Sequence, residues 1–364
     1  MQFVRVDHVD DAAISRVRLC NTVYSDVFVT ATVEDNQEAW LTAWQIVDNR
    51  IVKRGSEVFG FFVEDVDVSD VGVTKLGGSL TATATRQAGG YTKIHAWTVW
   101  GDGSITLAGE VPDLLVSATL GDVRQIRVQG LANDKIATVV KRWSNRLRVA
   151  VWRFDEAAGE IEFCDVKPAG PIQSVAPTGW RPLESWRLVT AALLTGGKLR
   201  LIHWKVTEQG QLTRLAHATT KGTVGAFDVF GFTGGASESV VISAVEEWDQ
   251  RLKFIAWNVS ESGPIERAPA PDGELTLQQK ANVISLKEPV VAFRNGDGDL
   301  ELIQWSWGPH SLAHLDDTFE VLGDFVGGGI TDVAVTIPAF MVPVTAVRMA
   351  GGFLRVHLWG MQPA

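Results

Sequence analysis

Charged side chains recur in short apolar segments that are spread along the whole chain. The segments include ISRVRL, VEDVDV, VRQIRV, VGAFDV and ITDVAV, and the charged positions are Arg16, Arg18, Asp65, Asp67, Arg127, Asp228 and Asp332. Guanidinium groups bind anions through charge-assisted hydrogen bonds, and carboxylates accept hydrogen bonds from hydroxyl groups. If these segments meet in space, the side chains can bind an anion or a small polar molecule. They can equally neutralise one another, because an unpaired buried charge is costly.

A second group of candidate residues is aromatic and lies in segments that we expect to be turns. These residues are Trp40, Tyr91, Trp143 and Trp248. A solvent-facing aromatic ring can stack on a sugar or a base, or can contact an apolar patch of a partner protein. Each ring can instead fold over the strands beneath it. Corresponding turns elsewhere in the chain lack the tryptophan, which argues against equivalent sugar sites in every unit.

Two segments have the look of calcium loops. Asn295–Asp299 reads NGDGD, whose alternating oxygen ligands suit a hard cation but whose residues are equally typical of a tight turn. Gly323–Gly329 resembles the calcium loop of FG-GAP propellers, but Val326 and Gly328 replace two acidic positions. We therefore expect no metal site and no cofactor. The sequence has no GxSxG, HExxH or GxxxxGK[ST] motif, so we assign no catalytic residue.

The overall composition excludes several classes of partner. The formal net charge is -10, whereas nucleic-acid binders usually carry a basic patch. The chain opens with MQFVRVDHVDD, which lacks the basic and apolar regions of a signal peptide. No stretch approaches the ~20 apolar residues that span a membrane. We expect neither nucleic acid nor membrane as a partner, and a cytoplasmic location.

The elements that position these residues follow from a repeated tryptophan. It stands at the end of similar segments (LTAW, IHAW, VAVW, LIHW, FIAW, LIQW, VHLW), at Trp44, Trp97, Trp152, Trp204, Trp257, Trp305 and Trp359. The spacing is therefore about 52 residues along the whole chain. A period in this range is typical of solenoids, propellers and arrays.

Each repeat contains four short runs rich in Val, Ile, Phe and Ala, bounded by turn residues, which is the signal of β-strands. Seven units of four antiparallel strands predict an all-β fold, a single seven-bladed β-propeller that spans residues 1–364 as one domain. The first strands, including LQQKAN (277–282) in the sixth unit, would line a central channel and bring the charged residues together. The turns between second and third strands would share one face and carry the aromatic residues.

The two ends of the chain complement one another. The last unit has three strands, and residues 2–9 (QFVRVDHV) match the pattern of a fourth strand. We expect the N-terminal strand to complete the last blade, so that no sheet edge is exposed at the seam.

In strand plan and closure the chain resembles the WD40 propellers, although the Gly-His and Trp-Asp motifs of that family are absent. The resemblance implies a scaffold or recognition role. Our first hypothesis is a non-enzymatic binding protein that holds a partner protein or a small polar ligand at the channel mouth and the loop face. The alternative is an enzyme (a lyase, cyclase or hydrolase) with an Arg/Asp site at the channel. A third hypothesis is a carbohydrate-binding, lectin-like propeller.

Overall fold

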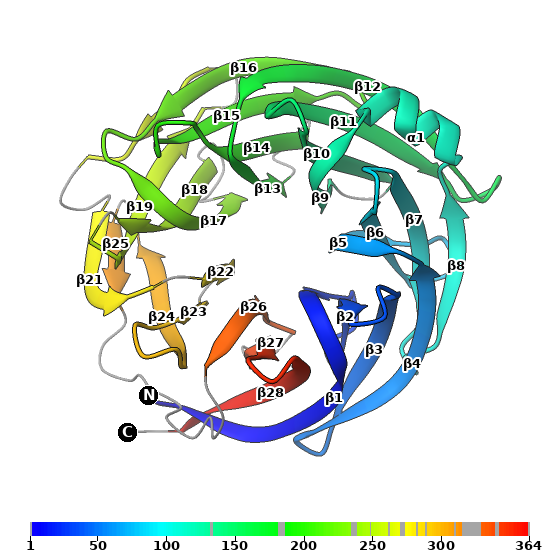
Figure 1. Ribbon diagram of the computed structural model, residues 1–364, viewed down its shortest axis with the longest axis horizontal. Helices are drawn as coiled ribbons and strands as arrows, with labels where there is room; N and C mark the ends of the chain where they lie inside the picture. Colours follow the sequence, from blue (N-terminus) through cyan, green and yellow to red (C-terminus); the bar gives the residue numbers. More distant parts are fainter. Residues whose placement is uncertain are drawn as a thin grey trace.

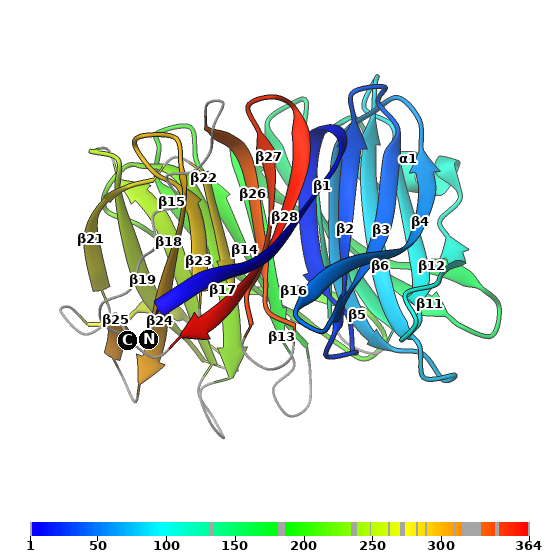
Figure 2. The same cartoon turned by 90° about the horizontal axis from the view of Figure 1, so that it is seen from below.

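In the computed structural model the chain forms a ring of β-sheets around a central opening, and its fold is a β-propeller (Figure 1). The structure describes residues 2–362 except 132–133, 181–185, 234–238, 248, 261–262, 270–273, 282, 288–289, 309–310, 315–328 and 339–341. Seen from the side, the strands of each sheet cross the thickness of the ring, and the chain ends lie close together (Figure 2).

The sheet that contains both chain ends has seven strands, in the order β26-β27-β28-β1-β2-β3-β4. Their bounds are β26 (Ile330–Thr336), β27 (Val344–Met349), β28 (Phe353–Gln362), β1 (Gln2–Asn21), β2 (Val27–Glu34), β3 (Ala39–Val47) and β4 (Arg50–Gly60). The long strand β1 pairs antiparallel with β28 from Gln2 to Ala13, and with β2 from Ile14 to Asn21. One strand therefore joins the first and last parts of the chain.

The next sheet has eight strands, in the order β5-β6-β7-β8-β12-β11-β10-β9. Their bounds are β5 (Val63–Val73), β6 (Ser79–Gln87), β7 (Thr92–Val99), β8 (Ile105–Glu110), β9 (Val123–Gly130), β10 (Lys135–Arg142), β11 (Arg146–Asp155) and β12 (Glu160–Pro171). Its two four-stranded halves meet at a single residue pair, Glu110 and Glu160. Between the halves lies α1 (Asp113–Leu120), a helix whose eight residues are too few for helical periodicity to be recognised in the sequence.

The remaining three sheets follow in chain order. The first contains β13 (Ser174–Trp180), β14 (Trp186–Leu193), β15 (Leu199–Val206) and β16 (Leu212–Thr219). The second contains β17 (Val224–Thr233), β18 (Ser239–Glu247), β19 (Arg251–Val259) and β20 (Ile265–Arg267), with β21 (Glu274–Lys280) also paired to β19. The third contains β22 (Val283–Lys287), β23 (Val290–Arg294), β24 (Leu300–Gly308) and β25 (Ser311–His314).

One predicted inner strand is wrong. The segment LQQKAN was expected at the central channel, but its strand residues belong to β21, where Lys280 lies opposite Arg251 of β19. The inner strand of that unit is β22, which begins at Val283. Alternating polar residues suit an outer strand as well as a channel strand, so the pattern alone does not separate them.

The repeated tryptophans whose side chains the structure describes are buried, and they all make the same type of hydrogen bond. Each of the six whose side chains the structure describes donates its indole N–H to a Ser or Thr hydroxyl 14 residues earlier, at 2.9–3.0 Å. For example, Nε1 of Trp152 donates to Oγ1 of Thr138 on the neighbouring strand. The large apolar ring therefore enters the core with its one polar group satisfied.

The described core residues form separate buried clusters, each of which combines side chains from consecutive units of the chain. In one cluster Trp152 of β11 packs with residues of β5, β6 and β7, the unit that precedes its own. Trp97 and Trp204 likewise pack against the units before theirs. Burial of these side chains therefore joins each unit to the next, which is how a propeller ring is held closed.

Candidate functional site

The first strands of the units surround the centre of the ring (Figure 1). Their residues line a central cavity with a volume of about 730 Å³. Its charged lining residues are Arg18, Asp67, Asp70, Arg127, Asp228 and Asp332. These four carboxylates and two guanidinium groups give the described lining an excess of negative charge. The cavity therefore favours a cation or a hydroxyl-rich molecule over the anion that the sequence suggested.

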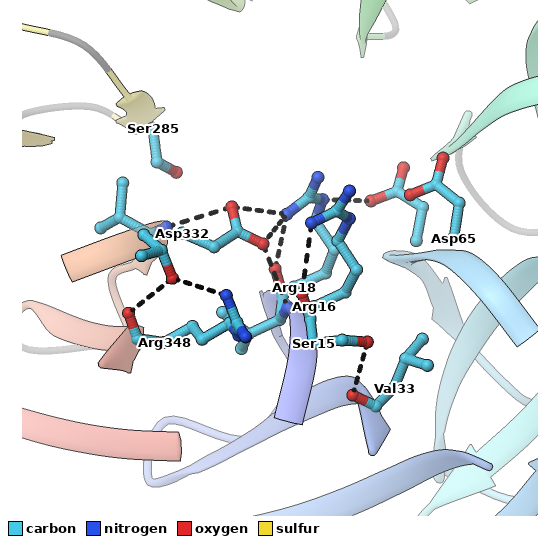
Figure 3. A network of polar contacts seen from close by, with 12 residues as sticks. Ser15, Arg16, Arg18, Val33, Asp65, Ser285, Asp332 and Arg348 are labelled. Atoms are coloured by element: carbon cyan, nitrogen blue, oxygen red, sulfur yellow. Dashed lines mark hydrogen bonds and ion pairs between the residues drawn. The ribbon is translucent and has the colours of Figure 1, made fainter. Parts of the chain in front are cut away.

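Arg18 is held by Asp332 across the seam between β1 and β26 (Figure 3). Its Nη1 donates to both carboxylate oxygens of Asp332, at 3.0 and 3.2 Å, and its Nε lies 3.7 Å from Oδ1 of Asp67. Burial alone would lower the pKa of the Arg18 guanidinium, but the carboxylates of Asp332 and Asp67 raise it above its ordinary value. The charge of Arg18 is thus neutralised inside the protein.

Arg127 has the same geometry on β9. Its Nη1 donates to the two carboxylate oxygens of Asp65 at 3.2 and 3.4 Å. Like Arg18, it also donates to the carbonyl of the preceding residue at 2.6 Å, here Ile126. Arg16, by contrast, is exposed, and its Nη1 donates to the carbonyl of Ser15 (Figure 3). The structure therefore brings Arg18 and Arg127 to carboxylates and leaves Arg16 in solvent.

The inner carboxylates and hydroxyls have a further role, because they accept backbone N–H groups from the next inner strand. Oδ2 of Asp65 accepts the N–H of Ile126 at 3.2 Å, and Oδ2 of Asp67 accepts that of Val128 at 2.7 Å. The same kind of bond recurs around the ring: the N–H groups of Val17, Gly130, Gly231, Leu286 and Val335 donate to the side chains of Asp332, Ser69, Thr178, Asp228 and Ser285, respectively. Inner strands are sheet edges, and these bonds satisfy edge N–H groups that would otherwise lack a partner.

Asp228 has no ion pair with any described residue, unlike Asp65, Asp67 and Asp332. Its Oδ2 accepts the N–H of Leu286 at 2.8 Å, and its Oδ1 accepts that of Val229 at 2.9 Å. Burial raises the pKa of this carboxyl to about 6, although both hydrogen bonds oppose the rise. A carboxyl with such a pKa can exchange a proton near neutral pH, so Asp228 is the cavity residue best suited to acid–base chemistry.

The loop-face candidates have different positions. Tyr91 and Trp143 lie in turns, and both rings are more than half exposed. Trp40 is not in a turn: it lies in β3 opposite Thr32 and is partly buried. The turn ends before Trp40. The N–H of Glu38 donates to the side-chain oxygen of Asn36 within the turn, and β3 begins at Ala39. Trp248 lies outside the described residues.

Two further exposed aromatic residues lie on the same face as Tyr91 and Trp143, and the sequence analysis did not predict them. Phe61 and Phe62, in the turn between β4 and β5, are 54% and 70% exposed. We call Phe61, Phe62, Tyr91 and Trp143 the aromatic strip. The signal for this site in the sequence is a pair of consecutive phenylalanines between two predicted strands. The turn that carries them joins two units and lies on the same face as the turns of Tyr91 and Trp143.

Backbone hydrogen bonds connect the turns that carry the aromatic strip. The N–H of Ala88 donates to the carbonyl of Phe62 at 2.7 Å, which joins the first turn to the turn of Tyr91. The N–H of Val123 donates to Gly90 at 3.3 Å, and that of Trp143 donates to Asp122 at 3.1 Å. The exposed rings therefore stand on one connected surface.

The guanidinium of Arg124 lies over the Trp143 ring, 5.3 Å from its centroid. This cation–π contact holds one face of the ring. At the other end of the strip, Phe62 has a left-handed backbone with φ 56°, which is unfavourable for a bulky residue. Such local strain is commonly found where a side chain has a functional position.

The calcium-like segment around Asn295 is a turn. The side-chain oxygen of Asn295 accepts the N–H groups of Asp297 and Asp299, both at 3.0 Å. In the part of the chain that the structure describes, no group of three or more His, Cys, Asp or Glu residues is arranged to hold a metal ion. The loop at Gly323–Gly329 lies almost entirely outside the described residues. No described helix is long and apolar enough to cross a membrane.

No protein-family model matches the chain, and no curated protein is significantly similar to it. Similar solved structures include Sqt1 of Saccharomyces cerevisiae, at 14% identity and a TM-score of 0.55, over 96% of this chain and 84% of that one. They also include the periplasmic gluconolactonase PpgL of Pseudomonas aeruginosa, at 12% identity and a TM-score of 0.55, over 82% of this chain and 84% of that one. At these identities the likeness concerns the fold alone, which is that of a β-propeller.

Proposed function

We propose that this chain is a seven-bladed β-propeller, one domain over residues 1–364, that acts as a non-enzymatic binding protein. The partner is a protein, and it is held on the face that carries the aromatic strip. The similarity to Sqt1 supports a propeller scaffold, and propellers commonly serve recognition.

Seven blades are supported by the way the core is divided. The described residues form seven buried clusters, and each combines side chains from two consecutive units. A closed ring of seven units has seven such boundaries. The pairing of β1 with β28 closes the last boundary and removes an exposed sheet edge.

The observation that carries the binding function is the contrast between the cavity and the aromatic strip. Arg18, Arg127 and the inner carboxylates described above already have partners within the protein, which are ion pairs, backbone N–H groups or both. The rings of the aromatic strip, in contrast, expose connected apolar surface that the fold does not bury. Exposed aromatic residues of this kind are the usual anchors of protein interfaces.

The test is affinity capture from cells of the source organism with quantitative mass spectrometry. The wild-type protein is compared with the double variant Tyr91→Ala/Trp143→Ala. Leu76→Ala is the matched control, because Leu76 is 79% exposed but lies in the turn between β5 and β6, at the opposite ends of these strands. We expect specific proteins that the wild type and the control retain to be lost from the double variant.

Two outcomes would contradict the proposal. Partners that bind all three proteins equally would place the interface elsewhere. A sugar that binds the wild type and is lost from the double variant, with no protein partner, would support the lectin-like function instead. Circular dichroism of each variant establishes that it is folded.

A second candidate function is an enzyme with its site in the central cavity. It is favoured by Asp228, whose pKa of about 6 suits a general acid or base, and the gluconolactonase has a similar fold. The test is a thermal-shift and turnover screen with hydroxyl-rich substrates such as lactones. Turnover that Asp228→Asn abolishes in a folded protein would make the enzyme the better assignment.

A further inference from the structure

On the outer rim of the ring, β8 and β12 approach each other beside α1 (Figure 1). Residues of β8, β12 and the start of α1 line a groove of about 920 Å³ there. It is separate from both the central cavity and the aromatic strip. Its wall includes Pro112 and Leu115 at the start of α1, the one helix in the described part of the chain. In repeat proteins, an insertion carried by a single repeat often marks a binding surface.

The groove combines apolar walls with an acidic rim. Leu107 of β8 and Phe163 of β12 line it, and both side chains are exposed. Leu114, the neighbour of Leu115 on α1, is 87% exposed. The charged lining residues are Glu110, Glu160 and Glu162, and no lysine or arginine is among the lining residues.

Most of this negative charge is not neutralised within the described part of the protein. Glu162 pairs with Arg153, whose Nη2 lies 2.5 Å from Oε2. Glu110 lies 3.7 Å from Nε2 of His95, but burial lowers the pKa of that histidine to about 4, so it is neutral at pH 7. Glu160 has no ion pair with any described residue. The groove therefore attracts positive charge.

The edges of β8 and β12 that border the groove can also pair with an additional β-strand. β8 and β12 run parallel and pair only at Glu110 and Glu160. The approach is also close at Gly109, where a Cβ atom would come within 2.6 Å of the carbonyl oxygen of Gly159. Since Glu110 ends β8 and Glu160 begins β12, the rest of the outer edge of each strand has no partner strand among the described pairings. Free edge N–H and C=O groups are the elements to which an extended peptide adds.

We infer that this groove binds an extended segment of a partner protein in which apolar side chains alternate with lysine or arginine. Alternate side chains of an extended segment point to opposite sides. Its apolar side chains would enter between Leu107 and Phe163, and its long basic side chains would reach the glutamates of the rim. This binding surface is additional to the aromatic strip and does not depend on it.

The probe is a short fluorescein-labelled peptide in which leucine alternates with arginine, flanked by serines. Binding to the full-length protein is followed by fluorescence anisotropy. Two matched peptides carry glutamate in place of arginine, or serine in place of leucine. We expect only the basic apolar peptide to bind, with an affinity that falls as salt is added.

The variants are chosen at exposed positions so that they fold. Glu160→Lys and Leu107→Ser should each weaken binding by about tenfold, which corresponds to about 1.4 kcal/mol. Glu266→Lys is the control, because it makes the same charge change at an exposed glutamate on the outer strand β20. Three results would overturn the inference: no binding of the basic apolar peptide, equal binding of the acidic peptide, or equal loss in Glu160→Lys and Glu266→Lys.

Discussion

Three buried histidines should make the stability of this propeller strongly dependent on pH between 5 and 7. His95, His203 and His357 lie on third strands and are almost fully buried. Burial lowers their pKa values from 6.5, to about 4 for His95 and His203 and to about 3 for His357. In the folded protein they remain neutral at pH 5, whereas in the unfolded chain they are protonated.

The magnitude follows from proton linkage. The unfolded state binds more protons, so stability rises with pH through this range and falls on acidification. A histidine with a pKa of 6.5 when unfolded and 4 or lower when folded loses about 2 kcal/mol of stabilisation between pH 7 and pH 5. The three together lose about 5–6 kcal/mol. Asp228 acts in the opposite direction, because its raised pKa favours the protonated folded state, and it restores about 1 kcal/mol.

The assay is urea denaturation followed by tryptophan fluorescence at pH 7, 6 and 5. We expect the free energy of unfolding to fall by about 4 kcal/mol from pH 7 to pH 5, a large part of the 5–15 kcal/mol typical of folded proteins. In His203→Leu the fall should be smaller by about 2 kcal/mol. His217→Gln, at an exposed histidine of β16, should retain nearly the full fall. Stability that does not change between pH 7 and pH 5, or identical slopes in His203→Leu and the wild type, would refute the reasoning.

Three further substitutions test the structural interpretation. Thr138→Val removes the acceptor for the buried N–H of Trp152 and should lower the free energy of unfolding by about 1–2 kcal/mol in urea denaturation; a loss near zero would show that the bond is dispensable. Asp332→Asn removes the main carboxylate of Arg18 and should cost about 3 kcal/mol in the same assay, whereas the exposed Asp297→Asn should cost nothing measurable. Phe62→Gly removes the cost of a left-handed backbone at a bulky residue, about 1–2 kcal/mol. The greater freedom of glycine in the unfolded chain lowers stability by about 0.5–1 kcal/mol. Thermal unfolding should therefore show equal or slightly higher stability. A clear loss of stability in Phe62→Gly would instead mean that the phenylalanine ring is structural.

The all-β propeller could be predicted because one large residue recurs at nearly constant spacing. The sequence contains a second regularity: a Ser or Thr precedes six of the seven repeated tryptophans by 14 residues. Val291 stands at that position before Trp305. The helix α1 and the outer strand β21 could not be predicted, because an eight-residue helix and a polar outer strand have no distinctive period.

The sequence predicted some of the charged residues of the inner strands but not their partners, and Asp70 of the cavity lining was not among them. Alternation in the first strands identified Arg18, Asp65, Asp67, Arg127, Asp228 and Asp332, and all of them lie on inner strands. Their partners could not be derived, because Asp65 and Ile126 are 61 residues apart and meet only through the register of two neighbouring units. For the same reason, the sequence could not distinguish charged side chains that bond to the backbone of a neighbouring strand from charged side chains that are available to bind a ligand.

That separation decides where the function of this propeller is to be sought. A carboxylate such as Asp67, which accepts a backbone N–H and neighbours Arg18, is explained by the stability of the ring and requires no ligand. An exposed ring such as Phe62, on a backbone that disfavours it, contributes little to folding and exposes apolar surface to water. The fold accounts for the first residue but not for the second. The aromatic strip and the acidic groove beside α1, whose side chains the fold does not use, are therefore the surfaces on which we propose that a partner binds. Asp228 caps an inner strand as Asp67 does, and it differs from Asp67 in lacking an ion pair with a described residue.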